Sequence, residues 1–269
     1  MTKIFETLNI ANNGSMNDPN VNSPVMNGSS ERLAGSRATQ TAYSGVAVSD
    51  EEAPRTVAPA LEMDLATRQE LTKLTHRLFL SSGGSRVVAF SGVEAGVGCS
   101  WILARVAQLL ANADAGSVCI VDADLSNPIQ HRYFRVGNGS GLSDALMHSH
   151  PIEEYLKRVG GGLHLLSSGS AIPKAETLFS SSAFRLRVEE LRARFDFLLF
   201  DTPPMATSSN ALEVASRAQG LAMVVEANST NRETAVKVAK EAAAANVHLM
   251  GAVLNKRTFP IPEAIYNRL

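Results

Sequence analysis

A glycine-rich segment, residues 91–100, follows a short apolar run and precedes an apolar stretch with helical spacing. Gly96 and Gly98 allow a tight turn and a close approach of the backbone to a ligand. Backbone N–H groups at such a strand-to-helix turn, together with the helix N-terminus, can cradle phosphate, and Ser100 stands where a hydroxyl would bind Mg²⁺. This glycine loop therefore predicts a phosphate site, although glycine-rich turns also occur for packing reasons alone.

The glycine loop lacks the lysine of the pattern G-x-x-x-x-G-K-[ST], because Cys99 occupies that position. Lysine places positive charge on phosphoryl oxygens, and cysteine has neither the charge nor the reach. Backbone amides and Mg²⁺ could still hold a nucleotide, but phosphoryl transfer should slow by orders of magnitude unless another cation substitutes. Arg105 is expected to point elsewhere, whereas Lys256 and Arg257 follow a different strand and are better placed to approach the loop.

Cysteine chemistry is a second way to interpret the same position. A thiol at a helix N-terminus can have a lowered pKa and be reactive, so Cys99 is considered as a nucleophile. Catalytic use of this thiol is the less favoured interpretation.

Two further apolar runs end in aspartate. Asp122 and Asp124 follow residues 118–121, and Asp201 follows residues 197–200 and precedes Thr-Pro-Pro. Residues at i and i+2 of an extended chain point to the same side, so the first two carboxylates could hold a metal-bound water or accept a proton from an attacking hydroxyl. Asp201 is expected to contact Mg²⁺ through water. Aspartate also caps strands and starts turns, but three such residues after a glycine loop favour a phosphate site with a metal.

Alternating strands and helices must position these residues, and their pattern begins near Leu61. Short continuous apolar runs predict buried strands at residues 87–90, 118–121, 163–166, 197–200, 221–225 and 249–254. Helical spacing predicts helices at residues 64–80, 101–113, 183–194 and 233–245. This alternation indicates a three-layer, Rossmann-like α/β domain with a mostly parallel sheet. In such folds the site lies beyond the carboxyl ends of the strands.

The first 60 residues differ from the rest of the chain. Asn, Ser, Gly, Ala, Thr and Pro dominate them, which predicts a disordered tail (residues 1–60) in front of a domain at residues 61–269. Residues 3–8 have apolar side chains at helical spacing, which fits either a short helical handle or an ordinary frayed terminus.

Composition excludes several classes of protein. The formal net charge of −1 gives no reason to expect a nucleic-acid binder. The 2 cysteines are too few for a disulfide framework, and no Cys-x-x-Cys is present to hold zinc or an iron–sulfur cluster. No apolar run reaches the roughly 18 residues of a membrane helix. The expectation is a soluble protein of a reducing compartment.

The order of these motifs resembles the MinD/ParA-type family of P-loop proteins. The matching elements are the glycine loop, V-D-A-D-L-x-x-P at residues 121–128, F-D-x-x-x-x-D-T-P-P at residues 195–204, and the late L-N at residues 254–255. Within that family the chain is most similar to bacterial tyrosine kinases and their relatives in exopolysaccharide synthesis. Residues 141–146 and 257–266 also look like this branch, and the doubled acidic element is the most specific match.

The resemblance implies a role for each matching residue, with ATP and Mg²⁺ as cofactors. The implied nucleotide-binding residues are Gly96, Val97, Gly98, Cys99 and Ser100, together with Asn255 facing the adenine. The implied metal-binding residues are Ser100, Asp122 and the Walker B aspartate, Asp201. The implied catalytic carboxylates are Asp122 and Asp124 of the Walker A′ element.

Three features depart from the kinase pattern. Cys99 makes the Walker A motif degenerate, and the tyrosine-rich C-terminal tail is absent, with only Tyr266 near the end. Residues 70–76 lie where the kinases carry E-x-x-R-x-x-R for ring assembly, but Lys73 and His76 replace the two arginines.

Three functions follow from the resemblance and its departures. The leading one is a cytoplasmic, kinase-like regulator or scaffold of exopolysaccharide synthesis or export, with weak or lost nucleotide binding. A membrane polysaccharide copolymerase or chain-length protein would be its partner and would recruit it to the inner face of the membrane. The second is an active ATP-dependent tyrosine autokinase or ATPase that uses a rearranged cation. The third is a MinD/ParA-like positioning ATPase that dimerises around ATP and so forms a homo-oligomer, against which stands the missing loop lysine.

Overall fold

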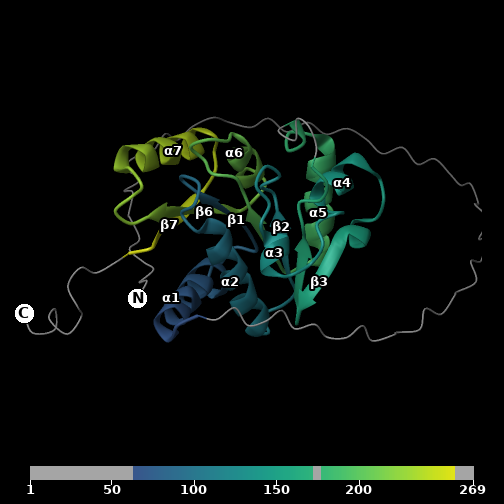
Figure 1. The fold of residues 1–269 in the computed structure, drawn as a ribbon, viewed down its shortest axis with the longest axis horizontal. Helices are drawn as coiled ribbons and strands as arrows, with labels where there is room; N and C mark the ends of the chain where they lie inside the picture. The colour runs from purple at the N-terminus through teal and green to yellow at the C-terminus, as the bar shows by residue number, and fades with distance from the viewer. Residues whose placement is uncertain (1–62, 172–176, 258–269) are drawn as a thin grey trace, which may run out of the picture. The chain divides into compact units, whose positions relative to one another are not determined.

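A seven-stranded sheet forms the centre of the part of the chain described by this computed structural model, residues 63–171 and 177–257 (Figure 1). The strand order is β3-β4-β2-β5-β1-β6-β7. The strands are β1 (Val87–Gly92), β2 (Val118–Asp122), β3 (Leu156–Gly160), β4 (Leu163–Leu166), β5 (Phe197–Asp201), β6 (Gly220–Glu226) and β7 (Leu249–Asn255). Every neighbouring pair is parallel except β3 with β4, so the sheet is mostly parallel, as predicted.

Helices cover both faces of this sheet and make a three-layer α/β fold (Figure 1). One face carries α1 (Leu65–Thr75), its π-helical continuation η1 (His76–Leu80) and α2 (Cys99–Asn112). The other carries α4 (Leu142–Met147), α5 (Ser182–Arg194), α6 (Asn210–Ala215) and α7 (Arg232–Ala244). Two short elements, α3 (Gln130–Tyr133) and the 3₁₀ turn η2 (Ile152–Tyr155), lie in the connections.

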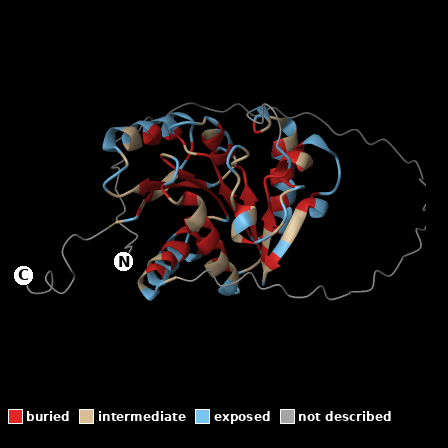
Figure 2. Cartoon of the chain, viewed as in Figure 1, coloured by how far each residue is buried: buried red, intermediate tan, exposed pale blue. Residues whose placement is uncertain are grey.

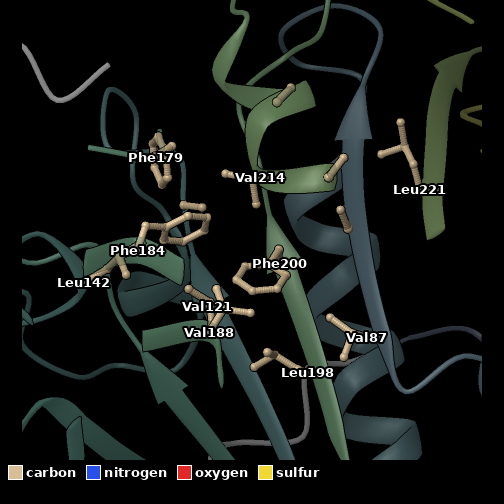
Figure 3. Close-up of a cluster of buried hydrophobic side chains, with 14 of the residues drawn as sticks. Val87, Val121, Leu142, Phe179, Phe184, Val188, Leu198, Phe200, Val214 and Leu221 are labelled. Atoms are coloured by element: carbon tan, nitrogen blue, oxygen red, sulfur yellow. The ribbon is translucent and has the colours of Figure 1, made fainter. Parts of the chain in front are cut away.

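Two hydrophobic cores sit on the two faces, and successive strand residues alternate between them. On β5, Leu198 and Phe200 enter the core beneath α5 and α6, while Phe197 and Leu199 enter the core beneath α1 and α2. Figure 3 shows Phe200 pointing toward Phe184 of α5 in the first core. Because both faces are covered, all five residues of β5 are buried, which Figure 2 shows for the central strands in general. For this reason the strands appear in the sequence as continuous apolar runs.

The predicted elements are present with small shifts at their ends. Asp64 accepts a hydrogen bond from the Thr67 amide and caps α1, which begins where predicted. Helix α2 begins at Cys99, two residues before the predicted start, so Cys99 and Ser100 belong to its first turn. The antiparallel edge strand β3 was not expected, because most of its residues are only partly buried and its apolar pattern is weak.

Several predictions fall on residues that the structure does not describe. The tail at residues 1–60, the handle at residues 3–8 and Tyr266 lie outside the described ranges, so the predicted domain boundary stays a prediction. Among the described helices, none combines the length and the apolar character that crossing a membrane requires.

Candidate nucleotide and metal site

The strand order gathers the predicted site residues along the carboxyl edge of the sheet. Asp122 ends β2 and Asp201 ends β5, and these two residues are direct neighbours in the parallel register. The glycine loop follows β1, which lies next to β5, and Asn255 ends β7 two strands further along. Residues that are far apart in the sequence therefore meet at one edge, as expected for a parallel sheet.

A buried glutamine links the two aspartates. Asp122 Oδ2 accepts hydrogen bonds from the backbone amides of Ile129 at 3.2 Å and Gln130 at 3.0 Å. Gln130 Nε2 donates to Asp201 Oδ2 at 2.7 Å and to the backbone carbonyl of Ser100 at 3.0 Å. Asp122, Gln130 and Asp201 are all 0% exposed. We call Ser100, Asp122, Gln130 and Asp201 the carboxylate cluster.

Three oxygens of the carboxylate cluster lack a protein partner. Within residues 63–171 and 177–257, Asp122 Oδ1, Asp201 Oδ1 and Gln130 Oε1 are buried and accept no hydrogen bond. Buried polar atoms are nearly always paired in folded proteins, so three together indicate a group that the protein itself does not supply. Carboxylate and amide oxygens are ligands for hard divalent cations, so these residues fit Mg²⁺.

Electrostatics also favour a cation at the carboxylate cluster. Burial raises the pKa of Asp122 well above its ordinary value, and the neighbouring Asp201 raises it further. Burial raises the pKa of Asp201 to about 7, although hydrogen bonds from the side chains of Gln130 and Ser100 act in the opposite direction. Two carboxylates this close cannot both ionise cheaply without a compensating positive charge.

Asp124 lies at the rim of the carboxylate cluster. Its Oδ1 accepts hydrogen bonds from the backbone amides of Ser126 at 3.2 Å and Asn127 at 3.0 Å, which closes a turn. Its charge still contributes to raising the pKa of Asp122 and of Asp201. The structure thus brings Ser100, Asp122 and Asp201 together and keeps Asp124 beside them, where its predicted base-like role stays a prediction.

The turn after Asp201 is tied to the strand that carries the glycine loop. The Ser91 hydroxyl donates to the carbonyl of Pro203 at 2.7 Å, and the Thr202 hydroxyl donates to the carbonyl of Phe90 at 2.9 Å. The rigid Asp-Thr-Pro-Pro sequence thereby fixes Asp201 beside the loop.

The glycine loop presents unused donors. A hydrogen-bonded turn closes over residues 95–96, and within the described ranges the backbone N–H groups of Glu94, Ala95, Gly96 and Gly98 donate to no protein acceptor, which leaves them available for an anion. Gly98 has φ +91°, and a Cβ there would lie 2.4 Å from Asn255 Nδ2. Gly96 has φ +81° with open space around it. The loop therefore needs glycine at both positions for its backbone and at Gly98 also for space.

The end of β7 holds this loop in place. Asn255, 6% exposed, donates from Nδ2 to the carbonyl of Val97 at 2.8 Å. Its predicted contact with adenine stays a prediction, and its observed contact is with the loop. Lys256 follows it and donates from Nζ to the carbonyl of Gly96 at 2.8 Å and to Glu226 Oε2 at 3.0 Å. The expectation that Lys256 approaches the loop from a different strand is therefore confirmed.

Cys99 faces the hydrophobic core and not the phosphate position. It is 8% exposed and belongs to the core beneath α1 and α2, with Val97 and Ile102. Burial raises the pKa of its thiol well above the ordinary value, and the charges of Asp201 and Asp124 raise it further. The idea of a reactive thiol with a lowered pKa is wrong, because desolvation outweighs any effect of the helix N-terminus.

Arg105 is not the missing cation either. It is 3% exposed, and its guanidinium lies 4.8 Å from the centroid of the Trp101 ring. The expectation that it points away from the loop fits this packing. Further from the site, Lys73 of the weakened ring-assembly segment pairs with Glu70 on the same helix at 2.7 Å.

Gln130 is the member of the carboxylate cluster that sequence reasoning missed. Glutamine is not a typical residue of phosphate or magnesium motifs, so its type carries no signal. The only available signal is its position, because it starts the short helix α3 two residues after Pro128, and its backbone amide caps Asp122.

Comparisons with known proteins agree with this geometry. The family model described as "Cellulose biosynthesis protein BcsQ" matches residues 85–256. The chain is 31% identical over 160 residues to the putative tyrosine-protein kinase CapB of Staphylococcus aureus, which covers 59% of this chain and 70% of CapB. It is 30% identical over 161 residues to the tyrosine-protein kinase YwqD of Bacillus subtilis (60% of this chain, 68% of YwqD). For the tyrosine-protein kinase etk of Escherichia coli K12, identity is 27% over 173 residues (64% of this chain), and the match spans only 24% of etk.

Solved structures share the fold. The chimerical protein CapA2B2 has a TM-score of 0.69 at 24% identity, covering 76% of this chain and 90% of that one. The kinase domain of VpsO has a TM-score of 0.67 at 23% identity, covering 71% and 95%. A ParA family ATPase from Chlorobium tepidum has a TM-score of 0.54 at 15% identity, covering 62% and 72%. With its fold, its motif order and its sequence matches in agreement, the chain belongs to the BcsQ family of ParA-like P-loop proteins, and bacterial tyrosine kinases are its homologues.

Proposed function

We propose that this protein is a kinase-like regulator or scaffold of polysaccharide synthesis or export that binds Mg·ATP weakly and transfers phosphate poorly. One observation carries the proposal: the carboxylate cluster keeps three buried oxygens without partners, while Cys99, in the lysine position, is packed into the core. The metal side of a nucleotide site is retained, and the charge that drives phosphoryl transfer is missing from the loop.

The residues present suit Mg²⁺ and a polyphosphate. Ser100, Asp122 and Asp201 would hold the ion, with Gln130 fixing the orientation of both carboxylates, and the ion would supply positive charge to phosphate oxygens when bound. The free amides of Glu94, Ala95, Gly96 and Gly98 would bind the phosphates, and Asp122 or Asp124 could accept a proton from a hydroxyl. Without a loop lysine, stabilisation of the transferring phosphoryl group is reduced, which favours regulation over catalysis.

The family and its kinase homologues support a role in polysaccharide synthesis. The matching family is named for cellulose biosynthesis, and the matched region covers only 24% of etk and 20% of the tyrosine-protein kinase ptk. If this chain works in the same kind of system, it needs a partner in the membrane across which the polysaccharide is exported. We propose a membrane copolymerase or chain-length protein as that partner, which recruits this protein to the inner face of the membrane.

Tyrosine phosphorylation distinguishes a regulator from a kinase. The purified full chain is incubated with Mg·ATP and analysed for phosphotyrosine by mass spectrometry, alongside Asp122→Asn. We expect no phosphotyrosine above that of the variant. Robust autophosphorylation that the substitution abolishes would contradict the regulator proposal and establish the second candidate, an active tyrosine kinase. That candidate has one observation in its favour, the contact of Lys256 with the glycine loop.

The partner is tested separately from the chemistry. The tagged full chain is expressed in its native host, and membrane proteins that co-purify after detergent extraction are identified. A copolymerase or chain-length protein should be recovered, and Asp122→Asn should alter the amount recovered if nucleotide controls the interaction. Recovery without any such membrane protein would contradict the scaffold role.

A further inference from the structure

We propose that Lys256 is the cation of this phosphate site and binds the polyphosphate chain in place of the lysine that Cys99 replaces. The inference deepens the proposed function and rests on it, because a phosphate must bind the glycine loop for Lys256 to matter. The ligand class is a polyphosphate, such as the triphosphate of ATP or inorganic tripolyphosphate.

The first support is the position of the ammonium group. Lys256 Nζ lies 2.8 Å from the carbonyl oxygen of Gly96, inside the segment whose backbone amides are free. The preceding Asn255 holds the carbonyl of the next loop residue, Val97, also at 2.8 Å. Two adjacent residues at the end of β7 therefore bind two adjacent carbonyls of the loop. Lys256 therefore places a positive charge beside the loop from the end of β7. No cation from α2, the helix that follows the loop, is needed for this.

The second support is the backbone at this position. Lys256 has φ +55°, in the left-handed region that residues other than glycine rarely adopt. Such conformations persist where the surrounding structure requires them, and they concentrate at functional sites. Here the left-handed turn directs the side chain back toward Gly96 as the chain leaves β7.

The third support is that Lys256 is free to move from its present partners. Its side chain is 46% exposed and that of its ion-pair partner, Glu226, is 25% exposed, at an N–O distance of 3.0 Å. Exposed ion pairs contribute little to stability, so exchanging Glu226 or the Gly96 carbonyl for a phosphate oxygen costs little. Arg105 has no such freedom, because it is buried against Trp101.

Substitution of Glu226 provides a control that should change affinity in the opposite direction. In the free protein Glu226, the last residue of β6, offsets the charge of Lys256, which directly follows Asn255, the partner of Glu226 in the register of β6 with β7. Removing the carboxylate should release the ammonium for phosphate. Glu226→Gln should therefore tighten polyphosphate binding a few-fold, whereas Lys256→Gln should weaken it.

The experiment measures binding of Mg·ATP and of inorganic tripolyphosphate to the full chain by calorimetry. Lys256→Gln should weaken both about tenfold, as expected for one charge-assisted contact, and Lys256→Arg should stay within about threefold of the unsubstituted protein. Lys240→Gln, on the exposed side of α7, is the matched control for loss of one positive charge and should leave both affinities unchanged. The dependence of affinity on salt should be weaker in Lys256→Gln than in either the control or the unsubstituted protein.

Repeating the Lys256→Gln substitution in the Cys99→Lys variant distinguishes the loss of a charge from the loss of a structural contact. In Cys99→Lys the loop regains its own cation, so the further change Lys256→Gln should cost much less than tenfold. A purely structural clamp would cost the same in both backgrounds, and that result would overturn the inference.

The remaining outcomes are also distinct. If the unsubstituted protein binds neither ATP nor tripolyphosphate, the proposed nucleotide binding fails. If it binds both and Lys256→Gln binds them equally well, only the inference about Lys256 fails. If Lys256→Gln weakens ATP alone, Lys256 contacts the nucleoside and not the phosphates, which also overturns the inference.

Discussion

The candidate site has two parts, the carboxylate cluster, which we call the metal side, and the glycine loop with Lys256, which we call the phosphate side. They differ in which groups of a nucleotide site are present. On the metal side, Asp122, Gln130 and Asp201 remain buried and joined by hydrogen bonds, with three oxygens left without a protein partner. On the phosphate side, Cys99 lies in the core, and Lys256, which follows β7, contacts the glycine loop. Uncompensated buried carboxylates are costly, so a site that had only decayed would not be expected to keep two of them. The difference indicates that buried carboxylates and a loop lysine are separable features of this fold, since this chain has the first without the second.

The largest effect should come from the metal side. Asp201→Asn removes a charge and an unpaired oxygen from the carboxylate cluster, so Mg²⁺-dependent ATP binding should weaken by about 100-fold, or about 2.7 kcal/mol. Calorimetry measures this against Asp114→Asn, an exposed aspartate in a turn with φ 49° that asparagine tolerates. Equal affinities for the two variants would show that the buried carboxylates serve packing alone.

Backbone geometry on the phosphate side should give the next largest effect. Gly98→Ala places a Cβ 2.4 Å from Asn255 Nδ2 at φ +91°, so it should lower the free energy of unfolding by about 2.5 kcal/mol. Gly96→Ala is the matched variant, because its φ of +81° is similar and its Cβ meets open space. It should cost only about 1 kcal/mol, from backbone strain. Urea unfolding of both variants measures the difference, and equal losses would mean that the Asn255 contact does not constrain the loop.

The pH dependence of stability tests the metal side without any ligand. The pKa of Asp201 is raised from 3.8 to about 7 by burial, so its contribution to stability is full below about pH 4 and is lost as the pH rises through about 7. Metal-free protein should therefore be less stable at pH 8 than at pH 5.5, by about 2 kcal/mol. Thermal unfolding in EDTA measures this loss. Asp201→Asn should flatten the curve near pH 7, and an unsubstituted protein that is more stable at pH 8 would contradict the raised pKa.

The smallest effect should come from restoring the loop cation. Cys99→Lys should tighten Mg·ATP binding about tenfold, or about 1.4 kcal/mol, because a lysine long enough to leave the core at this position would add a charged contact to the phosphates. Cys99→Ala removes only a thiol that is protonated and buried, so it should leave the affinity unchanged. Calorimetry compares the two variants. No gain from lysine, in a variant that unfolds at the same temperature, would mean that the loop has lost its phosphate geometry.

The sequence predicts the elements of this fold well where their signals are local. Continuous apolar runs mark the strands because both faces of the sheet are covered, and glycine and aspartate mark the strand ends because turns require them. The same local signals predict that Asp122, Asp201 and the glycine loop lie along one edge. They do not predict β3, whose partly buried residues lack a clear apolar pattern.

Features that depend on tertiary contacts could not be predicted from local sequence patterns. The link through Gln130 depends on a side chain that belongs to none of the motifs found in this sequence. The pKa of Cys99 was misjudged because the helix N-terminus is visible in the sequence and the burial of the thiol is not. The approach of Lys256 was expected from its place after a strand, but its pairing with Glu226 follows only from the register of β6 with β7.

The most direct test of the central claim is a titration of the unsubstituted full chain with ATP, performed once with Mg²⁺ and once with EDTA. The account predicts saturable binding of one nucleotide per chain with Mg²⁺ and much weaker binding without it, because the carboxylate cluster is intact and the loop amides are free. No binding up to about 1 mM ATP under either condition would contradict it, since that would place the interaction above about −4 kcal/mol.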